Sequence, residues 1–370
     1  MLGFLLFILT IAGVPHYLAL FAIIIYAIRG RYRQISEGLK LNKRFTGFLA
    51  LFVLLITINA IIHFAETGRF QVPNMYLMPF AFICALGLNE KDIKFFIYLV
   101  FIECLFGFYE YSLGINTILP GVETDDFSSE ELLYFKRVLG LSNNSSSFSE
   151  KLLFSIIFLS QFSDLFSKRV IISFFVVFIG GLFVTFNRTA IIASLIYLFF
   201  YYYSMILVVL KKRKGLGVAL LLIVIIVVGV AIPKYGLDIL SQFNRGGDEM
   251  DLTGRPYIWA SFYDFISNNL FLGNGSAHYM ISYYEGRMAH AHNSFIQLFA
   301  DHGIFIAIFY LLTIFSKFNK RNIIVCISIM VASLTQYVVF WGFSVPDVFL
   351  FAFLCNPKFY QHNTKSIFIK

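Results

Sequence analysis

Long apolar runs separated by shorter polar loops set the pattern of this sequence. Each run is close to the roughly 20 residues that a helix needs to cross the hydrocarbon core of a bilayer. The predicted spans are Phe4–Ile28, Phe45–His63, Pro73–Leu88, Phe95–Tyr111, Leu152–Phe166, Val170–Phe186, Thr189–Leu210, Leu216–Tyr235, Ser294–Phe315, Asn322–Trp341 and Pro346–Cys355. The last run is short enough for a re-entrant segment. The pattern predicts an all-α integral membrane protein with about 11 (10–12) transmembrane helices.

Every second loop in this arrangement is rich in Lys and Arg, and this bias predicts the orientation of the chain. The basic residues of these loops are Arg29, Arg31, Arg33, Lys40, Lys43, Arg44, Lys91, Lys94, Lys168, Arg169, Lys211, Lys212, Arg213, Lys214, Lys317, Lys320, Arg321, Lys358, Lys365 and Lys370. Because cytoplasmic loops carry such an excess, we expect these loops in the cytoplasm and the N-terminus outside. The basic run at 211–214 is interpreted as a topology marker and not as a nucleic-acid-binding patch.

Two longer polar loops, at 112–151 and 236–293, are then expected on the outer face. Together with the spans they are expected to form a single polytopic membrane domain over residues 1–370. The second loop carries basic and histidine side chains and leads directly into an apolar run. These side chains are Arg255, Arg287, His290 and His292. A basic, histidine-bearing loop beside a membrane helix is where we expect the chemistry.

Composition excludes a soluble globular protein. Hydrophobic residues make up 59% of the chain and charged residues only 14%, whereas soluble domains carry about a quarter charged residues. The mean hydropathy is +0.78. All four cysteines lie in apolar segments without metal-ligand spacing, so we interpret them as small core residues.

The sequence contains no P-loop, dinucleotide fingerprint, HExxH, paired CxxC or GxSxG motif. No metal and no cofactor is therefore expected. A site on the outer face has no access to ATP, so a reaction there needs a substrate that carries its own leaving group. Glu103 lies within an apolar run, where a charge is costly; it is interpreted either as a functional residue or as a protonated residue bonded to a neighbouring helix.

The basic residues expected outside run against the general bias, so each needs a reason to be there. They are Arg69, Lys136, Arg137, Lys151, Arg188, Lys234, Arg245, Arg255 and Arg287. Arg captures phosphate oxygens in bidentate geometry, so external arginines beside spans would suit a membrane-anchored diphosphate. The alternative is salt bridges at the rim with the acidic residues of the 112–151 loop.

Local patterns favour two of these arginines. Asn187 is suited to cap the helix that follows, which would place Arg188 at a helix N-terminus, where anions bind readily. Arg255 precedes Pro256, which is typical of a first helical turn. Apolar residues then recur at helical spacing through Ile266, which predicts a short amphipathic helix. It either lies on the outer membrane face or simply packs on the bundle.

His292 carries the most specific signal. Ser294 and Gln297 fit a capping box, which predicts a helix that starts at Ser294 with His292 just ahead of it. The positive end of that helix favours a neutral imidazole, and a neutral imidazole can accept a proton from a sugar hydroxyl. The alternative is a polar histidine satisfied at a loop end. His290 is a second, weaker candidate.

Four segments together resemble the O-antigen polymerase and O-antigen ligase superfamily. They read RVLGLSNNSSSFSE, TFNRTAIIASLIYL, TGRPYIWASFYDFISNNLFLGNG and HAHNSFIQLFADHGI. The most specific motif is a His-[Asn/Ser/Gln] pair followed by nine residues and Gly-x-x-[Gly/Thr/Tyr]. His292, Asn293 and Gly303 match it, whereas Ile306 departs from its last position.

The resemblance implies a metal-independent inverting glycosyltransferase of the GT-C type in the bacterial inner membrane, with its active site facing the periplasm. Its substrate would be an oligosaccharide linked to undecaprenyl diphosphate. The resemblance implies that His292 is the catalytic base and that Arg188, Arg255 and Arg137 bind the diphosphate. Arg287, Asn293 and His290 are further candidates for substrate binding.

Polymerase and ligase would share this donor and differ in the acceptor. A polymerase transfers the growing glycan to a lipid-linked repeat unit, with a chain-length regulator as a candidate partner, whereas a ligase transfers it to lipid A core. The departure at Ile306 and the Phe-rich spans favour the polymerase. A flippase for lipid-linked oligosaccharides is the alternative from another class, although the sequence shows no internal repeat of the kind typical of transporters.

Overall fold

A computed structural model of the chain describes residues 1–119, 137–212, 255–283 and 287–359. The α-helices of these residues are α1 (Leu2–Leu9), α2 (His16–Leu41), α3 (Lys43–Thr67), α4 (Met78–Gly87), α5 (Glu90–Leu113), α6 (Ser145–Gln161), α7 (Lys168–Val184), α8 (Arg188–Lys212), α11 (Arg255–Asn268), α12 (Ser294–His302), α13 (Ile304–Phe315), α14 (Ile323–Ser333) and α15 (Val345–Cys355). Two 3₁₀ turns, η1 (Asn74–Leu77) and η3 (Ser163–Leu165), lie between them. The predicted span Leu216–Tyr235 lies outside the described residues.

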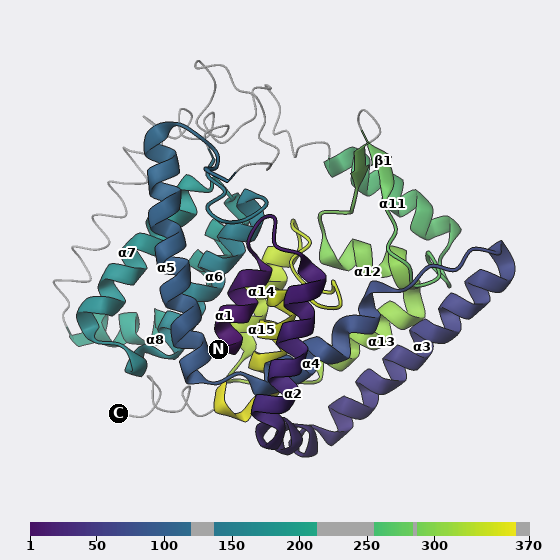
Figure 1. Cartoon of the computed structure of the whole chain (residues 1–370), viewed down its shortest axis with the longest axis horizontal. Coiled ribbons are helices and arrows are strands. Elements are labelled where there is room, and N and C mark those ends of the chain that lie inside the picture. The colour runs from purple at the N-terminus through teal and green to yellow at the C-terminus, as the bar shows by residue number, and fades with distance from the viewer. Residues whose placement is uncertain (120–136, 213–254, 284–286, 360–370) are drawn as a thin grey trace.

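The structure is mainly helical, as expected, and contains one small hairpin that the sequence pattern did not predict. Strands β1 (Ile281–Tyr283) and β2 (Arg287–Ala289) pair antiparallel within the large polar loop. In Figure 1, α5 to α8 lie on one side and α3 with α11 to α13 on the other. Helices α1, α2, α4 and α15 lie between these two groups.

Helix α15 occupies the centre of the fold. Every one of its residues is buried, and it packs closely on α4. Phe349, on this helix, makes edge-to-face contacts with Phe96 of α5 and Phe158 of α6 at centroid distances of 5.0 and 4.7 Å. An 11-residue helix buried on all sides has the character of a re-entrant segment.

Outward-facing apolar stripes on several helices are suited to lipid. On α7 the exposed residues Ile172, Val176, Ile179 and Phe183 recur at helical spacing. Similar stripes run along α3 and α8. Contiguous exposed apolar surface of this extent is rare in soluble monomers, so it marks the perimeter of a membrane protein.

By length and composition, α3 is the one helix among the described residues that could cross a membrane unaided. Shorter apolar helices lie at Asn74–Gly87, Ile304–Phe315, Ile323–Ser333 and Val345–Cys355. Within the part of the chain that the structure describes, the predicted apolar runs therefore do form helices, but many of these are shorter than a full span.

The first predicted span, Phe4–Ile28, is wrong as a single helix. Residues 10–15 break it into α1 and α2, with Gly13 at a φ of 75° and Pro15 as the N-cap of α2. The N–H of Ala12 in this break donates to the carbonyl of Leu141 at 2.8 Å. The chain therefore reverses once more than expected.

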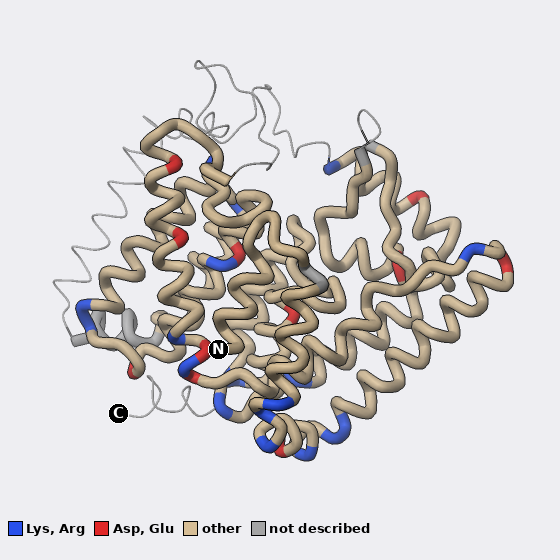
Figure 2. The backbone as a smooth tube through the Cα atoms, viewed as in Figure 1, with Lys and Arg blue, Asp and Glu red and all other residues tan. Residues whose placement is uncertain are grey.

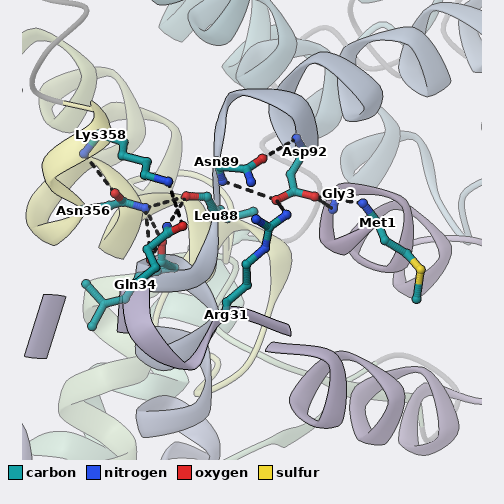
Figure 3. Close-up of polar contacts among 11 residues, drawn as sticks. Met1, Gly3, Arg31, Gln34, Leu88, Asn89, Asp92, Asn356 and Lys358 are labelled. Atoms are coloured by element: carbon teal, nitrogen blue, oxygen red, sulfur yellow. Dashed lines mark hydrogen bonds and ion pairs between the residues drawn. The ribbon is translucent and has the colours of Figure 1, made fainter. Parts of the chain in front are cut away.

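This extra reversal moves the start of the chain to the opposite end of the fold. The Asp92 carboxylate accepts from the Met1 amino group at 3.0 Å and from the Gly3 N–H at 3.4 Å, and pairs with Arg31 at 3.5 Å (Figure 3). Asp92 belongs to a loop expected in the cytoplasm. The start of α1 thus lies beside the basic loops and not at the end that was expected for it.

The same end of the fold is held together by side-chain amides that bind backbone carbonyls. Gln34 of α2 donates to the carbonyls of Leu86 and Leu88 at 2.6 and 2.8 Å. Asn356, just after α15, donates to Leu88 at 2.9 Å, and Lys358 donates to Gln34 at 2.8 Å (Figure 3). These bonds join α2, the turn between α4 and α5, and the end of α15.

Charged side chains are unevenly distributed along the helices. In Figure 2, Lys and Arg gather at the lower end of the bundle, where α2 meets α3. The upper end carries fewer of them among the residues drawn. This asymmetry agrees with the expectation that the basic loops share one side of the membrane.

Two later spans also differ from the prediction. The run Ser294–Phe315 is broken into α12 and α13 at Gly303, which has a φ of 74° and where the Cβ of any other residue would clash with the carbonyl oxygen of Phe271. The run Asn322–Trp341 is helical only to Ser333, and residues 334–344 are irregular. Such irregular backbone at membrane depth is tolerated where it lines a cavity.

Candidate functional site

A cavity of about 930 Å³ brings together residues from distant parts of the chain. Its wall includes the loop after α5, the starts of several helices, the end of the β-hairpin segment and residues 336–349. Five of the predicted site residues line it: Arg137, Arg188, Arg255, His290 and His292. Arg137 and His292 lie far apart in the sequence, and the fold brings them to the same cavity.

The other two predicted residues have different positions. Asn293 is 8% exposed and lies behind the wall. Its amide oxygen accepts from the N–H groups of Phe295 and Ile296, and its amide nitrogen donates to the carbonyl of Leu334 at 2.7 Å. Asn293 therefore positions the loop. The backbone of Arg287 pairs with Tyr283 in the hairpin, and its side chain lies outside what the structure describes.

Asn293, and not Ser294, is the N-cap of α12. The predicted start of the helix at Ser294 is confirmed, but the predicted capping box is wrong. Ser294 is fully buried, and its hydroxyl accepts from the N–H groups of Val338 and Val339 at 3.1 and 3.3 Å. Gln297 accepts from the N–H of Ala291 at 2.8 Å. Both side chains therefore hold neighbouring loops in place.

His292 has a backbone conformation that is uncommon for residues other than glycine. Its φ is 47°, and such left-handed conformations cluster at functional sites because the surrounding structure must maintain them. The carbonyl of Ala291 accepts from the indole of Trp259 at 2.7 Å. This bond and the one from the Ala291 N–H to Gln297 fix the chain immediately before His292.

His290 lies against His292 and is kept neutral. The two ring centroids are 4.2 Å apart, and the backbone N–H of His292 donates to Nδ1 of His290 at 3.1 Å. Burial lowers the pKa of His290 to about 3, and the nearby His292, His278 and Arg255 act in the same direction. With Nδ1 as an acceptor, the ring proton is on Nε2, so His290 is a hydrogen-bond donor at that atom.

Arg188 is the first residue of α8, as predicted. The amide oxygen of Asn187 accepts from the N–H of Ala190 at 3.1 Å, which confirms the predicted cap. Phe186, just before the cap, has a φ of 50° and also lines the cavity. The turn from α7 into α8 therefore presents both Asn187 and Arg188 to the cavity.

Arg255 begins α11, whose apolar face packs inward. Ile258 and Phe262 are buried in a small cluster with Ile281, Ala291 and Ile296. The sequence left open whether this helix lies on the membrane surface or packs on the bundle. Its apolar face packs on the rest of the protein. Tyr257 and Tyr263, on other faces, are 60% and 58% exposed.

The segment that carries Arg137 is held by two buried glutamates of α5. Glu103 accepts from the N–H of Leu141 at 3.0 Å, and Glu110 accepts from the N–H of Gly140 at 2.9 Å. Both carboxylates are completely buried. Glu103, which stood out in the sequence as an acid within an apolar run, therefore supports the segment that forms part of the cavity wall.

Lys151 was recognisable in the sequence as an external basic residue, but not as part of the site. It lines the cavity, is 3% exposed, and its ammonium lies 2.5 Å from Oε1 of Glu103. The neighbouring Glu150 also lines the cavity. The signal that could have revealed Lys151 was the matching isolated acid, Glu103, in a facing apolar run.

Several helices begin at this cavity. The capping residues on the wall are Asn144 (α6), Asn187 (α8) and Ser344 (α15), and His292 on the wall directly precedes Asn293, the N-cap of α12. Helix N-termini carry unpaired N–H groups and a partial positive charge, so their convergence with arginines favours an anion. Among the described residues, no group of three or more His, Cys, Asp or Glu could hold a metal ion.

Comparison with known protein families finds one similar family. Residues 173–311 match the family described as O-antigen ligase. This match supports the resemblance of the chain to the O-antigen polymerase and ligase superfamily over these residues. No curated protein and no solved structure matches the chain.

The stretch that matches the superfamily contains part of the cavity wall. Arg188, Arg255, His290 and His292 fall within it, whereas Arg137, Lys151 and Trp341 fall outside it. Gly303 of the superfamily motif lies at the break between α12 and α13, where no larger residue would fit. Ile306, which departs from the motif, packs against the main core.

Proposed function

We propose that this protein is a polysaccharide polymerase that uses a glycan linked to undecaprenyl diphosphate. The convergence of Arg137, Arg188 and Arg255 with several helix N-termini at the cavity that His292 also lines is the observation that carries this proposal. A diphosphate is the anion that such a positive cavity suits. The match to the O-antigen ligase family supports a lipid-linked oligosaccharide as the substrate.

In the proposed reaction, an acceptor sugar hydroxyl attacks the anomeric carbon of the donor glycan. A new C–O glycosidic bond forms as the C–O bond to the diphosphate breaks, with inversion at the anomeric carbon. His292 accepts the proton of the attacking hydroxyl. Undecaprenyl diphosphate leaves with the bonding electron pair, so the donor supplies the free energy of the reaction.

The arginines stabilise the charge that grows on the leaving diphosphate. Their planar guanidinium groups can bind two phosphate oxygens at once, and the helix N-termini add donors that are already oriented. Arg188, Arg255 and Arg137 are assigned to the donor diphosphate. His290, neutral and protonated at Nε2, is assigned to donate a hydrogen bond to the substrate.

We further propose that the protein is a GT-C-like, metal-independent enzyme of the bacterial inner membrane, with the cavity facing the periplasm. The gathering of Lys and Arg at the end of the bundle where α2 meets α3 supports this orientation. The loops at 112–151 and 236–293 would be the extracytoplasmic parts of one membrane domain. A chain-length regulator is a proposed partner.

An O-antigen ligase is the second candidate, because the matching family carries that description. The ligase would use the same cavity and transfer the glycan to lipid A core. The departure of Ile306 from the superfamily motif favours the polymerase.

The surface polysaccharide of a deletion strain distinguishes the two functions. A polymerase deletion leaves lipid A core with a single repeat unit. A ligase deletion leaves the core bare while long lipid-linked polymer accumulates. Unchanged polysaccharide in the deletion strain would contradict both.

A further inference from the structure

Two stacked aromatic rings form part of the cavity wall beside the histidines. The ring centroids of Tyr337 and Trp341 are 3.9 Å apart with an interplanar angle of 26°, and both residues line the cavity. The His290 ring lies 5.4 Å from Tyr337 and 5.7 Å from Trp341, with its plane nearly perpendicular to the indole. The stack therefore adjoins His290, whose ring centroid lies 4.2 Å from that of the proposed base His292.

The polar atoms of both rings are already bonded within the protein. The indole N–H of Trp341 donates to the carbonyl of Tyr337 at 2.6 Å. The hydroxyl of Tyr337 donates to the carbonyl of Phe340 at 3.0 Å. What the pair offers to the cavity is therefore ring surface and not a hydrogen-bond donor.

The segment that carries these rings is held in an irregular conformation by buried polar groups. Asp347, which is 2% exposed, accepts from the N–H groups of Phe340 and Trp341 at 2.7 and 3.2 Å. The Ser294 hydroxyl binds the N–H groups of the two residues before Phe340. Phe340 has a φ of 76°, and a strained residue of this kind persists where the structure around it requires it.

We propose that Trp341, supported by Tyr337, is a stacking platform for a pyranose ring of the lipid-linked glycan, next to His290 and His292. This inference rests on the proposed function. One face of a pyranose presents C–H groups that carry partial positive charge, and an indole face is electron-rich. Gln336 and Ser344, which also line the cavity here, can bind the sugar hydroxyls. This polar surrounding suits a sugar better than a polyprenyl tail.

The protein contains only two tryptophans, Trp259 and Trp341, so fluorescence reports on the platform directly. The test uses the full chain in detergent and the Trp259→Phe variant, in which Trp341 is the sole tryptophan. The probe is the soluble repeat-unit oligosaccharide released from the producing strain's own polysaccharide. We expect a saturable change in Trp341 emission, and no such change in the matched variant Trp341→Phe.

A second readout uses polymerisation of lipid-linked repeat units. Trp341→Ala is expected to raise the KM for the glycan about tenfold, the size of effect that a lost aromatic contact produces. Trp341→Phe retains a ring and is expected to recover most of this loss. A merely structural role for Trp341 would lower the melting temperature and kcat together without a selective change in KM.

Inorganic diphosphate separates failure of this inference from failure of the proposed function. If diphosphate binds the cavity but saturating oligosaccharide leaves the emission of Trp341 unchanged, the platform is overturned and the proposed function stands. If diphosphate does not bind but the oligosaccharide shifts the emission, the platform is supported and the diphosphate site is overturned. A shift that also appears in Trp341→Phe overturns the platform.

Discussion

The backbone N–H of His292 donates a hydrogen bond to Nδ1 of His290. This bond gives the two neighbouring histidines different roles. While Nδ1 of His290 accepts this hydrogen bond, it cannot act as a base. The imidazole of His292 is then the one that we assign to accept a proton from the acceptor hydroxyl. Both rings line the same cavity, so the difference is chemical and not one of location.

Replacement of His292 is expected to remove chain extension while the protein still folds. His292→Asn is the sharper variant, since Asn tolerates a positive φ better than Ala does. General-base catalysis contributes about 10²- to 10⁴-fold, so turnover should fall by that factor. The measurement is polymer length from purified lipid-linked repeat units. His290→Asn, which retains an acceptor near Nδ1, is the matched control and should lose less activity.

Wild-type polymer lengths in both His292→Asn and His292→Ala would exclude His292 as the base. Loss of membrane insertion in His292→Asn would show that its contribution is structural.

His290 predicts a specific dependence of stability on pH. Its pKa is about 3 in the folded protein, below the unfolded value of about 6.5. Below pH 6.5 the unfolded chain takes up a proton that the folded protein does not, so the free energy of unfolding falls as the pH decreases toward 3. His290→Asn removes this contribution. Its melting temperature should therefore approach or exceed that of the wild type as the pH is lowered from 8 to 5.

A constant difference in melting temperature between His290→Asn and the wild type over that pH range would contradict a buried neutral His290. The same scan on the Trp259→Phe variant controls for general acid sensitivity, because that substitution removes no titratable group.

Arg188 is expected to bind diphosphate through its planar fork. Arg188→Lys keeps the charge but loses the bidentate geometry. Hydrogen bonds between charged groups contribute about 1.5–3 kcal/mol, so the affinity for inorganic diphosphate should fall about 10- to 100-fold. Calorimetric titration of the detergent-solubilised protein measures this change. Arg29→Lys, at an exposed position on α2, is the control and should bind as the wild type does.

Undiminished diphosphate affinity in Arg188→Lys would remove the bidentate role. If Arg188→Gln also bound normally, Arg188 would not belong to the site.

Hydropathy was sufficient to predict the class of fold and most of the helices, because apolar content over about 20 residues decides whether a helix can enter a bilayer. It could not predict the breaks at Gly13, at Gly303 and after Ser333. A window average does not register one residue with positive φ or a polar side chain that binds a distant backbone. The missed break before α2 is also why the expected location of the N-terminus differs from the structure.

Some residues of the candidate site could be predicted because they depart from the usual distribution of charged residues or precede a helix. The arginines that are expected outside oppose the usual charge bias, and His292 precedes a helix, so both could be selected as candidates from the sequence. Lys151 was not assigned to the site because its partner Glu103 is 48 residues away. Trp341 was not found because the sequence pattern predicted a continuous helix there, and the bonds of Ser294 and Asp347 that prevent it link residues distant in sequence.

The buried pair of Lys151 and Glu103 is expected to stabilise the cavity wall only as a pair. Removal of one partner leaves a buried charge, which costs about 3–5 kcal/mol. Lys151→Met alone should therefore lower the melting temperature strongly, and the double variant with Glu103→Leu should recover part of that loss. Lys91→Met, at an exposed position, is the control and should change stability by less than about 0.5 kcal/mol. Additive losses in the double variant would contradict the coupling.

Reporter fusions test the orientation that places the cavity outside. Asn59 of α3 donates to the carbonyl of Leu272 at 2.9 Å and to the hydroxyl of Ser276 at 2.8 Å, so the loop around Gly275 lies near the C-terminal half of α3, which we expect on the outer side. A periplasm-dependent reporter fused after Gly275 should be active, and the same reporter fused after Lys43 should be inactive. Because α1 starts beside Asp92, we expect the N-terminus in the cytoplasm. A cytoplasm-dependent reporter fused there should be active, and a periplasm-dependent reporter should be inactive. A cytoplasmic signal after Gly275 would place the arginines and His292 on the side that the proposed reaction excludes.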